Sequence, residues 1–261
     1  MSDAHVPRKR FGQHFLHDAG ILKRIVECIS PKPDERVVEI GPGEGALTLP
    51  LLRAAGKLTA IELDRDLIEP LRQKARGVGE LEIISADVLT VDFSALSDGR
   101  PLRIVGNLPY NISTPILFHC LDYAAAISDM HFMLQKEVVD RMAAAPGSKV
   151  YGRLSVMLQF RCSVEPLLHV PPTAFRPPPK VDSAVVRLVP HATATLPDID
   201  AKLLGTVVRA AFGQRRKTLS NALRDVATSA DIEAAGIDPR ARAEQIPVEG
   251  FVNLVRHLQK T

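Results

Sequence analysis

The 261-residue sequence contains no tryptophan, and aromatic residues make up only 5% of it. Its three cysteines, Cys28, Cys120 and Cys162, lie in separate apolar segments and form no CxxC pair or Cys/His cluster. This spacing argues against a disulfide framework or a zinc centre and predicts buried thiols in a reducing compartment. The first fifteen residues lack the apolar stretch of a secretory signal peptide, and no hydrophobic run is long enough to cross a membrane. We therefore expect a cytoplasmic protein that binds neither a metal nor a membrane.

Basic and acidic residues are nearly equal in number, 33 against 30, but they are unevenly distributed along the chain. The net charge is +3, whereas residues 1–24 and 201–261 carry +3 and +4 and residues 25–200 carry −4. Basic ends around a slightly acidic centre predict a polyanion held by the flanks. Solvated charged faces are the alternative, and charge alone leaves both open.

The order of apolar segments predicts an α/β fold. Short β-branched runs that predict strands lie at 36–41, 57–64, 81–85, 102–107, 130–135, about 163–170 and 183–189, and helical patterns lie at 45–56, 65–76 and 113–123. Strands that alternate with helices form a parallel sheet with helices on both faces. We expect the last run to add an antiparallel edge strand, which completes a seven-stranded sheet. Helical spacing dominates from residue 201 onward, so we divide the chain into residues 1–192 and a small helical domain, 193–261.

A glycine turn, EIGPGEGALT (39–48), follows the first strand of the sheet. Such a turn lets a ligand approach the backbone closely and points free N–H groups at it. Glu62 ends the next strand about twenty residues later, where an acid accepts hydrogen bonds from ribose hydroxyls. Asp87 ends the third strand and is placed to contact an adenine amino group. Together they predict an adenosine-containing cofactor at the carboxyl edge of the sheet.

The glycine spacing distinguishes between two such cofactors. Gly41, Gly43 and Gly45 form a GxGxG pattern after the acid Glu39, and the loop has no basic residue to meet a pyrophosphate. This favours S-adenosylmethionine over NAD and leaves a dehydrogenase as the alternative.

The segment GNLPY (106–110) ends the fourth strand with groups suited to methylating an aromatic amine. The exocyclic nitrogen of adenine is a poor nucleophile because its lone pair is delocalised into the ring. The side-chain carbonyl of Asn107 and the backbone carbonyl of Leu108 are placed to accept its two hydrogens. Tyr110 offers a face on which the base can stack. The loop therefore predicts an N6-adenine methyltransferase that acts mainly by positioning.

Eight segments in order resemble the ribosomal RNA adenine N6-dimethyltransferase family. They are KRFGQHFL (9–16), EIGPGEGALT (39–48), IELDRDL (61–67), GNLPYNIST (106–114), MLQKEV (133–138), YGRLSV (151–156), FRPPPKVDSAVVRL (175–188) and FGQRRKTLSNAL (212–223). The resemblance implies a Rossmann-like class I methyltransferase sheet and a helical RNA-binding or ribosome-binding domain. It also implies dimethylation of two adjacent adenosines in the 3′-terminal hairpin of 16S rRNA, within an immature small subunit. We see no apolar stripe that requires a partner and expect a monomer.

The resemblance also implies roles for individual residues. It assigns cofactor contacts to His14, Leu16, Gly41, Gly43, Glu62, Asp87 and Asn107. It assigns contacts with the target base to Asn107, Leu108, Tyr110 and Phe175. The basic flanks are predicted to contact RNA phosphates through Arg8, Lys9, Arg10, Arg153, Arg215, Arg216 and Lys217. The family usually has Asn at the position of His14, and either side chain can donate a hydrogen bond to the cofactor carboxylate.

Two alternatives remain open at this stage. A large-subunit rRNA methyltransferase of the macrolide-resistance type shares the catalytic motifs, although FGQRRKTLSNAL and ARAEQIPVEGF (241–251) favour the small-subunit branch. An RNA-binding assembly factor with secondary methylation is the other. Phe175, beside several prolines, is equally suited to plug a core.

Overall fold

The computed structural model describes residues 14–260, which form two compact units. The first unit runs to Val139 and includes Glu165–Pro190. The second comprises Asp140–Val164 and the chain from His191 onward. The segment Asp140–Val164 thus joins the helical C-terminal part, although it lies within the range predicted for the first domain. Within the described residues, no helix is long and apolar enough to cross a membrane.

The first unit is built on a seven-stranded sheet with the order β4-β3-β2-β5-β6-β9-β7. The strands are β2 (Arg36–Ile40), β3 (Lys57–Glu62), β4 (Glu80–Ser85), β5 (Leu102–Asn107), β6 (Ile127–Gln135), β7 (Cys162–Val170) and β9 (Ser183–Pro190). β2 to β6 pair in parallel, and β9 pairs antiparallel with β6. A separate two-stranded ladder joins β1 (Phe15–Leu16) to β8 (Phe175–Arg176). The α/β class, the seven strands and the antiparallel direction of β9 are as the sequence predicts.

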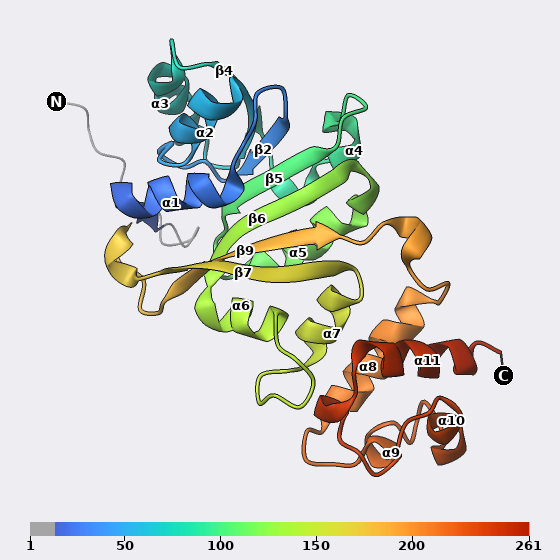
Figure 1. Cartoon of the computed structure of the whole chain (residues 1–261). Coiled ribbons are helices and arrows are strands. Elements are labelled where there is room, and N and C mark those ends of the chain that lie inside the picture. The colour runs from blue at the N-terminus through green and yellow to red at the C-terminus, as the bar shows by residue number, and fades with distance from the viewer. Residues whose placement is uncertain (1–13, 261) are drawn as a thin grey trace. The chain divides into compact units, whose positions relative to one another are not determined.

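Helices cover both faces of this sheet, with α1 in front and α5 behind in Figure 1. The helices of the first unit are α1 (Ala19–Ile29), α2 (Thr48–Ala55), α3 (Arg65–Ala75), α4 (Phe93–Leu96) and α5 (Ser113–Asp122), and α6 (Lys136–Met142) starts in it. α1 was not predicted from the sequence. Its start is fixed by Asp18, whose carboxylate accepts hydrogen bonds from the N–H groups of Gly20 and Ile21. Two α1 residues, Ile25 and Ile29, are buried in the core between α1, α2 and the sheet.

The predicted position of the last strand is wrong. β9 does not lie at the sheet edge but between β6 and β7. Ala184, Val185, Val186 and Leu188 are all buried, so both faces of β9 are covered, as an internal strand requires. β7 instead forms the edge, and most of its residues remain exposed or half-buried. A short apolar run does not show which neighbour it will pair with, so the sequence could not place it.

The second unit has its own apolar core. It contains α7 (Arg153–Gln159), α8 (Ala201–Gly213), α9 (Leu219–Ala222), α10 (Ser229–Ala234) and α11 (Val248–Leu258). Tyr151, Phe251 and Leu204 are buried at its centre, and the Tyr151 hydroxyl donates to the Ile246 carbonyl at 3.0 Å. The predicted helical stretch 201–223 is interrupted at 214–218, where the basic run QRRK lies between α8 and α9.

Candidate active site

One cavity of about 350 Å³ opens at the carboxyl ends of β2, β3, β5 and β6. Its lining contains most of the predicted cofactor and base contacts: His14, Leu16, Gly41, Gly43, Glu62, Asp87, Asn107, Leu108 and Tyr110. The carboxyl ends of neighbouring parallel strands meet at one edge, so residues from distant motifs come together there.

The glycine turn after β2 requires glycine at two positions that line the cavity. Gly41 has φ +66° and Gly43 has φ +56°, both in the left-handed region. A Cβ atom on Gly43 would also lie 3.1 Å from the ring of Phe15. The turn therefore brings bare backbone to the cavity wall and packs against the N-terminal strand β1.

Glu62 connects this turn to the end of β3. Its carboxylate accepts hydrogen bonds from the Gly43 N–H at 3.1 Å and the Asp64 N–H at 2.8 Å, one on each oxygen. Burial raises the pKa of Glu62, while these backbone N–H groups act in the opposite direction. Each oxygen keeps a second lone pair, which is sufficient to accept hydrogen bonds from two ribose hydroxyls.

Asp87 is the exposed acid on the cavity wall. Its Oδ1 accepts the Leu89 N–H at 3.0 Å and caps a short 3₁₀ turn. This bond fixes the carboxylate and leaves Oδ2 to meet an adenine amino group. Leu63 and Leu89, which are 52% and 38% exposed, border the same part of the cavity and offer apolar surface to a ring.

Asn107, the last residue of β5, and Tyr110, three residues later in the loop that follows, both line the cavity. The Asn107 side-chain amide donates to the His14 carbonyl at 3.1 Å, so its oxygen is the end left for a ligand. The Leu108 N–H donates to the Met133 carbonyl and fixes the loop against β6. The Tyr110 hydroxyl lies 2.7 Å from Ser183 Oγ, and burial raises the pKa of Tyr110. Sequence reasoning did not find this role of Ser183, because the contact spans 73 residues.

His14 contacts two parts of the site. Its ring stacks on Tyr110, and its Nδ1 lies 2.7 Å from the Pro177 carbonyl oxygen. A carbonyl only accepts, so Nδ1 carries the hydrogen and donates. Nδ1 is therefore engaged with the loop after β8, and the predicted donation to a cofactor carboxylate would have to come from an N–H at Nε2.

Phe175 departs from its predicted place. It is 2% exposed, packs in the core with Leu168 and Val170, and is not part of the cavity lining. Leu16 pairs with it in the β1–β8 ladder. In this structure Phe175 plugs the core, and its contact with a base stays a prediction that requires the ring to move.

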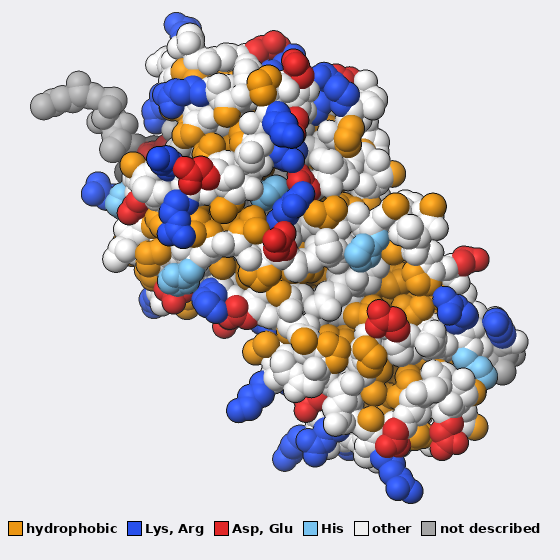
Figure 2. Space-filling model, in the orientation of Figure 1, with side chains coloured by type: hydrophobic (Ala, Val, Ile, Leu, Met, Phe, Trp, Pro, Cys, Tyr) orange, Lys and Arg blue, Asp and Glu red, His pale blue; other side chains and the backbone are white. Residues whose placement is uncertain are grey.

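The predicted phosphate contacts are only partly described. Arg8, Lys9 and Arg10 lie outside the described residues. Arg153, Arg216 and Lys217 are exposed on the second unit. Arg215 is also exposed, but it donates to the Lys149 carbonyl at 2.7 Å and lies 3.4 Å from Glu244. Figure 2 shows Lys and Arg side chains standing out from the surface among scattered acidic ones.

Two buried polar groups of the cavity were not predicted as site residues. Glu39 and His131 are 2% and 3% exposed and both line the cavity. Glu39 Oε2 and His131 Nδ1 have no hydrogen-bond partner in the structure. Burial raises the pKa of Glu39 to about 8 and lowers that of His131 to about 4. Glu39 stands two residues before the first glycine of the turn, and this position could have identified it as a cavity residue. No motif near His131 in the sequence indicates that it lines a cavity.

This geometry fits an S-adenosylmethionine site, since the acids, the glycine turn and the Asn107 loop line one cavity. The sequence model of the ribosomal RNA adenine dimethylases matches residues 4–260. The chain belongs to the ribosomal RNA adenine dimethylase family. The chain therefore uses S-adenosylmethionine, as the motifs predicted, and the NAD alternative is wrong.

Individual members of the ribosomal RNA adenine dimethylase family are similar over nearly the whole chain. A protein named ribosomal RNA small subunit methyltransferase A from Xanthomonas campestris is 64% identical over 247 residues, which cover 95% of this chain and 94% of the relative. The protein of the same name from Xanthomonas oryzae is 63% identical over equal coverage.

Solved structures agree with the fold. A dimethyladenosine transferase from Plasmodium falciparum superposes with a TM-score of 0.80 at 26% identity and covers 95% of this chain and 98% of that one. The 23S rRNA methyltransferase ErmE gives a TM-score of 0.72 at 28% identity, covering 94% and 99%.

Proposed function

We propose that this protein transfers methyl groups from S-adenosylmethionine to N6 of two adjacent adenosines in the 3′-terminal hairpin of 16S rRNA, giving N6,N6-dimethyladenosine. The observation that carries the proposal is that the Asn107–Tyr110 loop and the Gly41–Gly43 turn line one cavity. The relatives that are 63–64% identical support the small ribosomal subunit as the substrate, because each is named a small subunit methyltransferase.

One group of cavity residues binds the cofactor, and another group binds the target adenine. Glu62 and Asp87 hold the ribose and adenine of the cofactor, and the backbone of the glycine turn and His14 Nε2 hold its methionine end. When bound, S-adenosylmethionine supplies the sulfonium methyl group. Asn107 Oδ1 and the Leu108 carbonyl accept the two hydrogens on N6 of the target adenine. Both acceptors pull the N6 lone pair out of conjugation with the ring and aim it at the methyl group.

Tyr110 fixes the plane of the target base. The ring is anchored at its hydroxyl by Ser183 and packed on one face by His14, so it provides a rigid stacking surface. The methylated amine loses its proton to water, so the chain needs no dedicated base. Catalysis then comes from positioning and from the two carbonyl acceptors.

We further propose that the substrate is an immature small subunit in the cytoplasm and that the enzyme acts as a monomer. Arg153 and the basic run 215–217 would hold the RNA while the adenosine is flipped into the cavity. Among the exposed large apolar residues of the described part of the chain, Leu63 and Leu89 border the cavity, so their exposure needs no partner subunit.

The test is transfer of labelled methyl groups from S-adenosylmethionine to small subunits isolated without this modification. We expect dimethyladenosine at two neighbouring positions of the terminal hairpin. Label on large-subunit RNA alone would assign the chain to the 23S branch, which ErmE represents among the structural neighbours. Stable binding to immature subunits with no methyl transfer would favour an assembly factor.

A further inference from the structure

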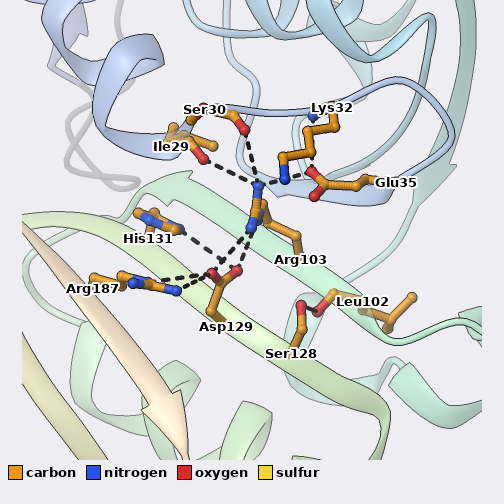
Figure 3. Close-up of polar contacts among 10 residues, drawn as sticks. All are labelled: Ile29, Ser30, Lys32, Glu35, Leu102, Arg103, Ser128, Asp129, His131 and Arg187. Carbon is orange, nitrogen blue, oxygen red and sulfur yellow. Dashed lines mark hydrogen bonds and ion pairs between the residues drawn. The ribbon is translucent and has the colours of Figure 1, made fainter.

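A cluster of charged side chains from β5, β6 and β9 surrounds one buried carboxylate (Figure 3). It lies on the same face of the sheet as Glu39 and His131 of the cavity lining. Its centre is Asp129 of β6, whose side chain is 3% exposed. Arg103 of β5 donates to both oxygens of this carboxylate, at 2.8 and 3.2 Å. Arg187 of β9 donates to Oδ2 at 3.1 and 3.3 Å. One carboxylate is therefore held by two guanidinium groups.

Arg103 also ties this cluster to the end of α1. Its Nη1 donates to the Ile29 carbonyl at 3.1 Å, to the Ser30 carbonyl at 3.3 Å and to Glu35 Oε2 at 2.8 Å. Ile29 itself lines the cavity. The cluster thus fixes α1, β5, β6 and β9 relative to one another on one side of the cavity.

His131 is the point at which the cluster meets the cavity. It follows Asp129 by two residues on the same strand, so both side chains point to the same face of the sheet. Its Nδ1 lies 3.9 Å from Asp129 Oδ1 and makes no hydrogen bond. Arg187 is its direct partner in the β6–β9 ladder. The ring therefore lies between the ion cluster and the cavity, which it lines.

We propose that Arg103, Asp129 and Arg187 are positioning residues that hold His131 as an uncharged ring at the floor of the cofactor pocket. The inference rests on the proposed use of S-adenosylmethionine. Arg103, Asp129 and His131 lie outside the quoted motifs, and Arg187 lies within the last strand segment, 175–188.

The charges around the ring explain this state. Asp129 alone would draw a proton onto His131, but the two arginines occupy that carboxylate and oppose a further positive charge. Burial is the largest effect on the pKa of His131 and lowers it to about 4, with Arg103 and Arg187 acting in the same direction and Asp129 against them. Glu39 of β2 lies on the same sheet face in register with Val105 and His131. The pKa of Glu39, about 8, leaves this side chain protonated and therefore uncharged at neutral pH. α1 contributes the apolar residues Ile25 and Ile29 to the cavity lining, which add no charge.

An uncharged His131 ring avoids electrostatic repulsion of the positively charged methyl donor. S-adenosylmethionine carries a positive sulfonium, whereas the product, S-adenosylhomocysteine, has a neutral sulfur. A charged imidazolium would repel the methyl donor and leave the product almost unaffected. The arrangement therefore protects the preference for donor over product. Asp129 also favours the hydrogen on Nδ1, which leaves Nε2 as an acceptor toward the cavity.

The test compares the dissociation constants of S-adenosylmethionine and S-adenosylhomocysteine between pH 7.5 and 5.5. The variant is Arg187→Gln, because this side chain is 40% exposed and its removal leaves Arg103 on Asp129. The quantity compared is the dissociation constant of S-adenosylmethionine divided by that of S-adenosylhomocysteine. We expect this ratio in Arg187→Gln, relative to the wild-type ratio at the same pH, to rise on acidification by about tenfold, which corresponds to a repulsion of roughly 1.4 kcal/mol. Dividing by the wild-type ratio cancels the contributions of groups that the substitution leaves unchanged.

Arg72→Gln is the matched control, since Arg72 is 54% exposed and pairs only loosely with Glu69 at 3.8 Å. A ratio in Arg187→Gln that stays equal to the wild-type ratio over the whole pH range would overturn the inference. Failure of the wild type to bind S-adenosylmethionine would instead remove the proposed function.

A second measurement reads the state of the His131 ring directly in the wild-type protein. Nitrogen-15 NMR of histidine-labelled wild-type protein, with the His131 signal assigned by its loss in His131→Gln, reports the protonation state of each ring nitrogen. We expect a neutral ring with the hydrogen on Nδ1 at pH 7. An imidazolium, or a hydrogen on Nε2, would overturn the inference.

Discussion

The imidazole of His14 stacks on the phenol ring of Tyr110, with the ring centroids 5.9 Å apart and the planes inclined by 25°. The same imidazole donates to the Pro177 carbonyl, and the backbone carbonyl of His14 accepts from Asn107. One residue thus joins the N-terminal strand, the base-binding loop and the loop after β8.

Replacing His14 separates its ring from its hydrogen bond. His14→Asn removes the ring against Tyr110, and we expect the methylation rate at saturating S-adenosylmethionine to fall about fivefold to tenfold, the loss of a contact worth ~1 kcal/mol. His14→Phe keeps a ring of similar size and should recover most of the rate. Equal losses in both variants would show that the bond to Pro177, not the stack, is what matters.

Tyr110→Ala should separate base binding from cofactor binding. Stacking of a base on an aromatic ring is worth ~1–3 kcal/mol, so we expect kcat/KM for small subunits to fall by about 10-fold to 100-fold. Tyr110→Phe keeps the ring and loses only the contact with Ser183, which predicts a much smaller loss. Isothermal titration with S-adenosylmethionine should give the same affinity for all three proteins. A large loss of cofactor affinity in Tyr110→Ala would contradict the assignment.

Glu39 makes the stability of the ligand-free protein depend on pH. Its pKa is about 8 in the folded protein, against 4.5 for an ordinary glutamate. Between these values the folded chain holds a proton that the unfolded chain releases, so the free energy of unfolding falls as pH rises through this window. Glu39→Gln cannot lose a proton, and its stability relative to wild type should increase by about 3 kcal/mol from pH 5 to pH 8. Urea denaturation at both pH values measures this difference.

The exposed residue Glu69 provides the control for that experiment. Its side chain is 59% exposed, so Glu69→Gln should leave the pH dependence of unfolding as in the wild type. If Glu39→Gln and wild type lost stability in parallel, Glu39 would be ionised in the folded protein.

Asp129→Asn should destabilise the first unit strongly. The substitution leaves Arg103 and Arg187 without the carboxylate that both of them bind, and breaking one side of a buried ion pair costs roughly 3–5 kcal/mol. Asp98→Asn is a suitable comparison, because its pair with Arg100 lies at the surface and should contribute little. Chemical denaturation of the two variants gives the comparison, and similar unfolding midpoints would show that the buried carboxylate contributes no more than the exposed one.

The basic run between α8 and α9 should determine the salt dependence of RNA binding. Neutralising Arg215, Arg216 and Lys217 together should weaken binding to small subunits and reduce the slope of log affinity against log salt by about 2. We expect less than three full contacts because Arg215 already lies beside Glu244. Neutralising Arg224, Arg240 and Arg256, which are also exposed on the second unit, provides the same change of net charge. An equal change of slope in both triple variants would reflect net charge rather than a phosphate-binding site.

Most of the sheet could be predicted because its strands are continuous apolar runs that end at glycine or acidic residues. β2 and β5 begin at the predicted residues. A parallel strand that is buried on both faces is a nearly continuous hydrophobic run, and such a run is recognisable in the sequence. α1 was missed although its apolar residues recur at helical spacing and Asp18 is a typical N-cap residue. The position of β9 depends on pairing between strands, which local pattern does not contain.

The candidate site divides in the same way. Residues within motifs, such as Gly41, Glu62 and Asn107, line one cavity, and their contacts with the cofactor stay predictions. His131 and Ser183 were missed because their roles arise from contacts across the sheet with Asp129 and Tyr110. Phe175 was placed by resemblance, and the structure buries it because Leu16 and the residues of β7 surround it.

The ladder between β1 and β8 also has a consequence for synthesis on the ribosome. His14 and Pro177, which this ladder brings together, are 163 residues apart in the chain. The glycine turn and the Asn107 loop leave the exit tunnel long before the partner of β1 exists, so the cavity of a growing chain lacks one wall. A nascent chain therefore gains the complete donor pocket only when more than two thirds of its length has been made. The complete donor pocket, and methyl transfer with it, is thus available only after β8 has been made.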